Sequence, residues 1–187
     1  MSNLVEAKQD RTRMTLRALT LDGLMIAVSI VLTRFLSLNV PIGGGIGARV
    51  GLGHLPIVFV GIVLGPVHGL IVGAAADVVG HVLWPVGPFV WQITAISALN
   101  GVIPALIARL RWQKSLTVRI WAGVVISRLV LNLGWLPFAL RDVLKLPYWP
   151  VLAGQAAGSV VMIPATAFLT VSLVQAFEHE GFGHVRS

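Results

Sequence analysis

The sequence contains no cysteine and few charged residues. The absence of cysteine excludes a disulfide scaffold, a thiolate metal site and a catalytic thiol. Charged residues make up only 11% of the 187 residues, against about 25% in an ordinary soluble domain. Hydrophobic residues make up 56%, and the mean hydropathy is +0.88. This composition excludes a soluble enzyme, a nucleic-acid-binding protein and a disordered protein, and it places the chain in a lipid bilayer.

Apolar runs of the length needed to cross a bilayer recur along the whole chain. A membrane-spanning helix needs about 20 mostly apolar residues. The segments that reach or approach this length are 16–36, 49–64, 67–83, 89–110, 116–136 and 151–176. We therefore predict an all-α integral membrane protein, a six-helix bundle that forms a single domain over residues 1–187. The parts outside the bilayer would be an N-terminal segment, a glycine-rich outer loop and a C-terminal tail, at 1–15, 37–48 and 177–187.

The basic residues predict the orientation of this bundle. Residues 1–17 carry four Lys or Arg side chains, and the connection at 109–119 carries another four. The connections on the opposite side carry Arg34, Arg49, Arg141 and Lys145. Because basic connections stay on the cytoplasmic side, we predict that both termini lie on the cytoplasmic side of the membrane.

Glycine is concentrated in the first outer connection. Residues 37–53 read SLNVPIGGGIGARVGLG, which contains six glycines and one proline. A segment with this many accessible backbone conformations suits a lid or a backbone-lined cradle for a ligand, although a flexible loop without a role would have the same composition. Neither GxGxxG nor GxxxxGK[ST] fits the sequence, so the chain has no predicted site for ATP.

Several polar side chains lie within the apolar segments. Asp77 is followed one helical turn later by His81, and Arg128 is followed by Asn132. Arg34 and Arg49 border the first outer connection, and Gln155 opens the last segment. Because a charged group at mid-bilayer costs about 2.5–3.5 kcal/mol on insertion scales, such groups face the protein interior or water. We expect these residues to converge on one polar cavity that binds a substrate. Alternatively, Asp77 pairs with Arg49, Arg128 or a backbone amide and only fixes the bundle.

Two further features concern possible ligands. Asp77 and His81 would supply only two metal ligands, so no metal site is predicted. The aromatic residues Trp84, Phe89 and Trp135 lie near the predicted outer face. They suit stacking walls for a flat heterocycle, or else belong to the aromatic belt that membrane proteins carry at the lipid interface.

Small residues lie on one side of the first apolar segment. Ala18, Gly23 and Ala27 allow another helix to approach closely. This face serves either packing within the bundle or docking of a partner membrane protein. Asp22 adjoins the face, and we expect it to pair with Arg17 or to lie at the partner contact.

The order of several short motifs resembles the substrate-binding (S) components of energy-coupling factor (ECF) vitamin transporters, most closely the folate group. The longest match is RVGLGHLPIVFVGIVLGPVHGLIVGAAADVVGHVLWPVGPF at 49–89, which is similar to the pattern R-I-x-x-G-x-L-P-I…G-x-x-x-G-P…G…D-x-x-G…P-x-G-x-F. Shorter matches are LTRFLSL, ALNGVIPALI and LVLNLGWLP, at 32–38, 98–107 and 129–137. The resemblance covers most of the chain.

This resemblance implies a substrate-capture subunit in a bacterial or archaeal plasma membrane, which is not an enzyme and needs no cofactor of its own. It would bind a water-soluble vitamin from outside, beneath the connection between the first two helices. It would deliver the vitamin through a separate transmembrane coupling (T) subunit and two ATPase subunits, which use the ATP. The family's docking pattern A-x-x-x-A on the first helix corresponds here to Gly23 and Ala27.

The identity of the vitamin stays open at this point. Folate is favoured, and Arg34, Arg49 and Arg128 could hold its carboxylates. The polar run that folate-type members carry in the last helix is replaced here by LAGQAAGSVVMIPATAF, with Gln155 as one of its few polar residues. Hydroxymethylpyrimidine, pyridoxine and pantothenate are therefore alternatives. A different function, that of a stand-alone proton-coupled carrier that uses Asp77 and His81, is also an alternative.

Overall fold

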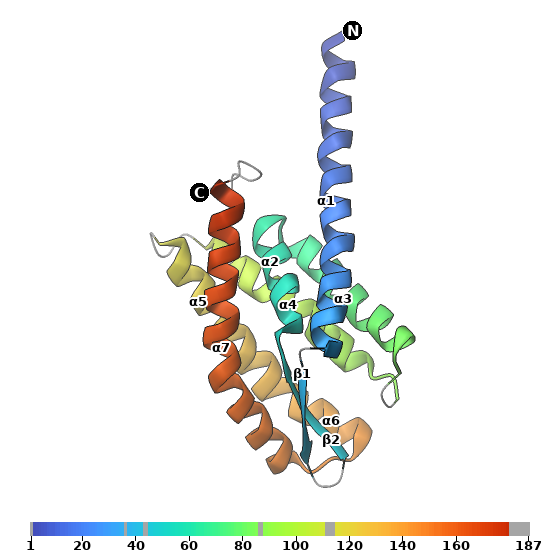
Figure 1. Cartoon of the computed structure of the whole chain (residues 1–187), viewed down its shortest axis with the longest axis vertical. Helices are drawn as coiled ribbons and strands as arrows, with labels where there is room; N and C mark the ends of the chain where they lie inside the picture. Colours follow the sequence, from blue (N-terminus) through green and yellow to red (C-terminus); the bar gives the residue numbers. More distant parts are fainter. Residues whose placement is uncertain (1, 36, 43–44, 86–87, 111–114, 180–187) are drawn as a thin grey trace.

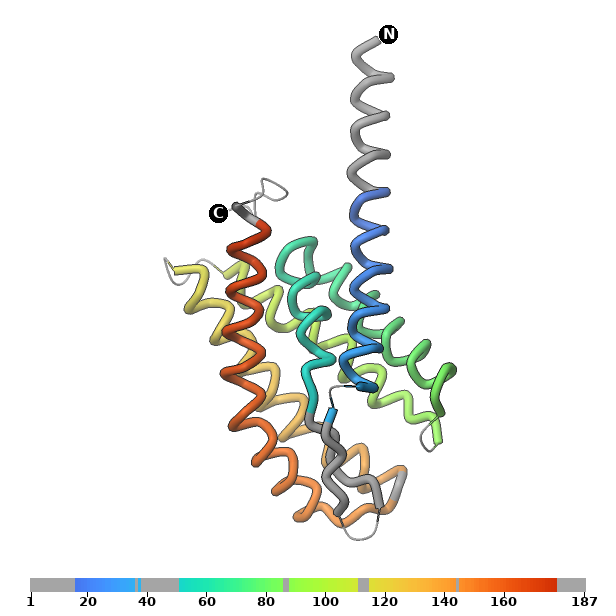
Figure 2. The backbone as a smooth tube through the Cα atoms, viewed as in Figure 1, coloured from blue at the N-terminus to red at the C-terminus, as the bar shows by residue number. Residues whose placement is uncertain are grey.

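A computed structural model of the chain describes the backbone of residues 2–35, 37–42, 45–85, 88–110 and 115–179 (Figures 1 and 2). Side chains are described for 16–35, 37, 51–85, 88–110, 115–143 and 145–177. The protein is a bundle of helices with one short hairpin. Figure 1 shows the start of α1 and the end of α7 at one end of the bundle, and the hairpin with α6 at the other.

The first helix is longer than its apolar part. Helix α1 (Ser2–Phe35) is continuous and includes the N-terminal segment that we expect at 1–15, and residues Leu16–Phe35 within it are apolar enough to cross a membrane. The two strands β1 (Ser37–Ile42) and β2 (Gly45–Gly51) follow it.

The glycine-rich connection forms an antiparallel β-hairpin rather than an irregular loop. Its register pairs Ser37 with Gly51 and Ile42 with Gly45, with a shift between Val40 and Pro41. Because proline has no backbone N–H to donate to a ladder, an irregularity at this position is expected. The predicted second span at 49–64 is wrong at its start, since residues 49–51 belong to β2.

The central part of the bundle consists of two consecutive helices. After the 3-10 turn η1 (Leu52–His54) come α2 (Leu55–Val63) and α3 (Pro66–Leu83). The tight turn between them has Gly65 at φ +124°, a conformation that favours glycine. Eight of the nine residues of α2 are buried, and Figure 2 shows α2 between α1 and α7. Helix α2 is therefore the core around which the other helices pack.

The second half of the chain contains two long apolar helical stretches. Helix α4 (Trp91–Arg109) is followed by α5 (Leu116–Ser127), the π-helical segment η2 (Arg128–Trp135) and α6 (Leu136–Leu144), and then by α7 (Tyr148–His179). The predicted outer connection at 137–150 is thus mostly helical. Pro137 lies at the start of α6, where proline is compatible with a helix. Residues 180–187 of the predicted tail lie outside the described residues.

The helices have the length and surface of membrane spans. Within the described residues, five stretches are long and apolar enough to cross a bilayer, and a shorter apolar helix runs over Leu52–Val63. Large hydrophobic side chains such as Leu19, Val82 and Val160 are more than half exposed on the outside of the bundle. Exposed apolar surface of this extent is suited to contact with lipid.

Glycines allow α2, α3 and α4 to touch through their backbones. A Cβ atom added to Gly101 on α4 would lie 2.4 Å from the carbonyl oxygen of Gly69 on α3. One added to Gly61 on α2 would lie 2.2 Å from the carbonyl oxygen of Gly101. Small residues permit this close approach in membrane helices. The three helices that carry much of the site are therefore held at fixed distances.

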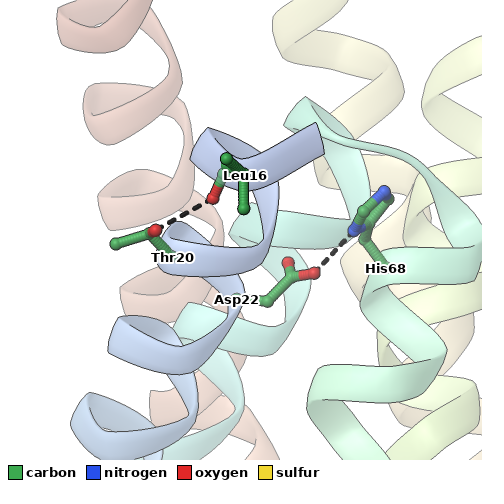
Figure 3. Close-up of polar contacts among 4 residues, drawn as sticks. All are labelled: Leu16, Thr20, Asp22 and His68. Atoms are coloured by element: carbon green, nitrogen blue, oxygen red, sulfur yellow. Dashed lines mark hydrogen bonds and ion pairs between the residues drawn. The ribbon is translucent and has the colours of Figure 1, made fainter. Parts of the chain in front are cut away.

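A partly buried polar pair joins α1 to α3. The Oδ2 atom of Asp22 lies 2.6 Å from Nδ1 of His68 (Figure 3). Asp22 is only 4% exposed. On the same helix, the hydroxyl of Thr20 donates to the carbonyl of Leu16. The expected pairing of Asp22 with Arg17 is thus replaced by a contact that fixes α1 against its neighbour.

Candidate functional site

A cavity of about 550 Å3 opens inside the hairpin end of the bundle. Its wall is formed by α1, η1, α2, α3, α4, η2, α6 and α7, together with the base of the hairpin. The predicted site residues on this wall are Arg34, Asp77, Phe89, Arg128, Asn132 and Gln155. Residues from α1, α3, η2, α7 and the connection before α4 therefore meet at one cavity.

The π-helical segment presents the strongest hydrogen-bond donor of the site. Arg128 is 8% exposed and lines the cavity. Its Nη2 atom is buried and has no hydrogen-bond partner among the described protein atoms. Because leaving a buried charged donor unpaired is costly, a guanidinium in this position is suited to an anionic group of a ligand.

A buried network fixes the orientation of the neighbouring amide. The hydroxyl of Ser127 donates to Oδ1 of Asn100 at 2.7 Å, so Nδ2 of Asn100 is left as the donor. That nitrogen donates to the carbonyl of Ile96 at 2.9 Å and to Oδ1 of Asn132 at 3.5 Å. The side-chain oxygen of Asn132 is thereby used within the protein. Its Nδ2 is available as a donor to a ligand in the cavity.

Asp77 and Arg128 both line the cavity and are not paired with each other. The Oδ2 atom of Asp77 accepts a hydrogen bond from the hydroxyl of Thr94 at 2.6 Å. Arg34 donates through Nη2 to the carbonyl of Gly80 at 2.5 Å. Among the described side chains, no lysine or arginine forms an ion pair with Asp77. The alternative in which Asp77 pairs with Arg128 to fix the bundle is therefore not the arrangement found here.

Of the three aromatic residues expected as stacking walls, one lines the cavity. Phe89 contacts His81 edge-on, with ring centroids 5.4 Å apart, and both are on the wall. Trp84 and Trp135 are not among the lining residues. Because η2 has i to i+5 bonding, each turn takes in more residues than an α-helix. The seven-residue spacing from Arg128 to Trp135 therefore no longer returns to the same face.

Arg49 is the remaining arginine that we expect at the site, and only its backbone is described. Arg49 lies on β2, opposite Asn39 on β1. Its side chain lies outside the described part of the structure.

The sequence did not indicate several polar residues of the wall. These are Ser29, Thr33, His54 and Ser97. Ser29 on α1 donates to the carbonyl of Gly53 at 2.7 Å, which ties α1 to η1, the turn that follows the hairpin. Thr33 donates to the carbonyl of Ser29 in its own helix. Single hydroxyls that can be satisfied within a helix give little signal in a sequence.

The small residues of α1 lie on an open surface. Gly23 and Ala27 are exposed, and Ala18 is half-buried. A Cβ atom added to Gly23 would meet no atom within 4 Å. Their role in packing within this chain is therefore minor. No group of three or more potential metal ligands lies together in the described part of the chain.

These features define a multi-pass membrane protein with a ligand-sized cavity near one end, whose mostly apolar wall carries a few polar and charged side chains. Comparison with known proteins gives its family. A family model described as "ECF-type riboflavin transporter, S component" matches residues 13–178. The chain therefore belongs to this family of S components, which are substrate-binding subunits of transporters rather than enzymes. The resemblance noted in the sequence is confirmed at the level of the family.

Individual relatives agree with this assignment. The chain is 29% identical to the folate transporter FolT of Clostridium novyi (strain NT) over 147 residues. This alignment covers 78% of this chain and 80% of that protein. The fold is similar to a crystal structure of FolT bound with folic acid, with a TM-score of 0.68, 22% identity and coverage of 83% and 94%. It is also similar to the S component of a bacterial ECF transporter, with a TM-score of 0.65, 19% identity and coverage of 88% and 97%.

Proposed function

We propose that this S component captures a water-soluble vitamin that carries a carboxylate, with folate favoured, in the cavity at its hairpin end. The main support for this proposal is Arg128, which is almost fully buried and lines the cavity. The Nη2 atom of its guanidinium has no hydrogen-bond partner among the described protein atoms. Arginine binds carboxylates through a planar set of donors. Asn132 and Gln155 add neutral polar groups beside it.

Folate is favoured over riboflavin because of charge. The folate transporter of Clostridium novyi is a relative at 29% identity, whereas the name of the family model refers to riboflavin. Folate has a glutamyl tail with two carboxylates, and riboflavin has no carboxylate. A cavity of about 550 Å3 lies within the range of about 300–1,000 Å3 that holds drug-sized ligands. The charge of Arg128 therefore supports folate, and smaller vitamins such as pantothenate would leave space unfilled.

Equilibrium dialysis of the purified protein in lipid nanodiscs tests this proposal. We expect radiolabelled folate to bind saturably at one site without ATP, because the ATPases belong to other chains. An excess of unlabelled folate should displace the label, and riboflavin should not. Displacement by riboflavin, together with the absence of folate binding, would contradict the proposal.

Delivery of the vitamin requires partners, and we propose that α1 meets them. An ECF transporter of this type would supply a coupling subunit and two ATPases. The surface around Gly23 and Ala27 supports docking because both residues are exposed and Gly23 has open space above it. Another helix can approach such a surface closely.

Replacing Ala27 with tryptophan is expected to abolish vitamin uptake and leave vitamin binding unchanged. The indole would hold a partner helix away from α1, while Ala27 is exposed and is not one of the residues that line the cavity. Uptake is measured in cells that supply the partner subunits, and binding is measured on the purified variant. Ala157→Trp is the matched control, because Ala157 is an exposed alanine on α7. Uptake retained by Ala27→Trp would place the docking surface elsewhere.

We also propose that the chain crosses the membrane six times, with both termini inside. The distribution of basic residues supports this orientation, and the start of α1 and the end of α7 lie at the same end of the bundle (Figure 1). The short helix over Leu52–Val63 would complete the second crossing together with the hairpin.

Because the protein has no cysteine, single introduced cysteines report this orientation directly. Arg141 on α6 and Ser115, directly before α5, are both exposed. Figure 1 shows α6 at the hairpin end of the bundle and the start of α5 toward the opposite end. A membrane-impermeant maleimide should label Arg141→Cys in intact spheroplasts and label Ser115→Cys only after permeabilisation. The reverse pattern would mean that the hairpin end faces the cytoplasm.

A further inference from the structure

One charged group on the cavity wall is not explained by an anionic ligand. Asp77 lies on α3, is half-buried and lines the same cavity as Arg128. A carboxylate in a cavity that binds only anions would repel its ligand. Its presence therefore requires either a cation in the protein or hydrogen-bond donors on the ligand.

The described protein supplies one donor and no cation to this carboxylate. Thr94 on α4 donates its single hydroxyl proton to Oδ2 at 2.6 Å. Arg34, which also lines the cavity, donates to the carbonyl of Gly80. A carboxylate has about four acceptor positions on its two oxygens. After the bond from Thr94, Oδ1 and one further position on Oδ2 remain as acceptors on this lining residue.

The surroundings of Asp77 suit a flat ring. Phe89 and His81 lie on the adjoining wall with their rings 5.4 Å apart, and Ile93 lines the cavity one residue before Thr94. Apolar and aromatic surfaces of this kind pack against the faces of a heterocycle. The hydrogen bond from Thr94 in turn fixes the carboxylate, which reduces the entropy lost when a ligand binds.

We propose that Asp77 binds the donor edge of an aminated heterocycle, that is, a ring N–H and the amino group on the adjacent carbon, through both of its oxygens. This inference rests on the proposed function and deepens it. It gives the ligand a direction, with the amino-substituted ring at Asp77 and the carboxylate at Arg128. The 2-amino-4-oxo ring of folate has such an edge, and the dioxo ring of riboflavin has no amino group there.

The experiment compares folate with 2-desamino-2-methylfolate, which keeps the tail and replaces the amino group by a methyl group. Dissociation constants are measured for the wild-type protein, for Asp77→Asn and for Ser115→Ala, a control far from the cavity. The wild-type protein should bind folate at least about 10-fold more tightly than the analogue, since about 1.4 kcal/mol corresponds to each factor of ten. In Asp77→Asn the affinity for folate should fall, because an amide presents only one acceptor oxygen. The ratio between the dissociation constants of the analogue and of folate should then shrink to about threefold or less.

Each outcome has a distinct meaning. Equal binding of both compounds by the wild-type protein would overturn the role of Asp77 and leave the proposed capture of folate intact. A proportional loss of both compounds in Asp77→Asn would also overturn it, because a merely structural role reduces both affinities alike. If the wild-type protein binds neither compound, the proposed function itself fails. The wild-type comparison needs no substitution, so it holds even if Asp77→Asn does not fold.

Discussion

Replacing Arg128 with methionine is expected to weaken folate binding by about 100-fold or more. Removing one partner of a buried, hydrogen-bonded charge pair costs about 2–5 kcal/mol, and about 1.4 kcal/mol corresponds to a factor of ten in the dissociation constant. Arg128 is 8% exposed, so water can replace little of the lost interaction. Methionine keeps most of the apolar volume of the side chain. The dissociation constant is measured by isothermal titration calorimetry in detergent.

Two further variants separate the charge from other effects. Arg119→Met removes an arginine from the same continuous helical stretch without altering the cavity wall, and it should leave the affinity within about twofold. Arg128→Lys keeps the charge but loses the planar pair of donors, so an intermediate loss is expected. Unchanged folate binding in Arg128→Met would show that the ligand lies elsewhere or carries no charge at this position.

Replacing Gly101 with leucine is expected to prevent stable folding. The first added carbon would lie 2.4 Å from the carbonyl oxygen of Gly69, and the contact is with backbone that no rotamer change can move. Separating α3 from α4 would also disturb α2, which packs against the same glycine. We expect the free energy of unfolding to fall by about 4 kcal/mol or more, which is a severe effect for a single substitution. Thermal unfolding is followed by the intrinsic fluorescence of the six tryptophans.

The matched control is the same substitution on another helix. Gly23→Leu places its side chain where no atom lies within 4 Å, so the melting temperature should change little. Comparing two glycine-to-leucine changes in helices cancels the general effect of helix propensity. A melting temperature for Gly101→Leu close to that of Gly23→Leu would mean that the three helices are not held together at this point.

Much of the helical framework could be predicted because membrane spans have an unambiguous composition. The predicted third span at 67–83 agrees with α3 to within one residue, since Gly65-Pro66 and Trp84-Pro85 mark its ends. The hairpin was not predicted, because its glycines hide the alternation that identifies a strand. Helix α6 was missed because Pro137, Arg141 and Asp142 resemble a connection, although proline is well tolerated at the start of a helix.

Part of the candidate site could be predicted because polar groups are costly in lipid and therefore stand out in apolar segments. Asp77, Arg128 and Asn132 stand out in apolar segments for this reason, and all three lie on the cavity wall. Trp84 and Trp135 were predicted from proximity along the sequence alone, which does not determine the face of a helix. The network of Asn100 and Ser127 around Asn132 depends on how two helices pack, and no spacing within one segment indicates it.

The central claim is that the cavity holds a carboxylate-bearing vitamin, and native mass spectrometry of the gently purified protein tests it most directly. Cells grown with a mixture of vitamins would offer the protein a free choice of ligand. We predict one bound molecule per chain with the mass of a folate, and its loss in Arg128→Met. A bound molecule with the mass of riboflavin, retained in Arg128→Met, would contradict the claim.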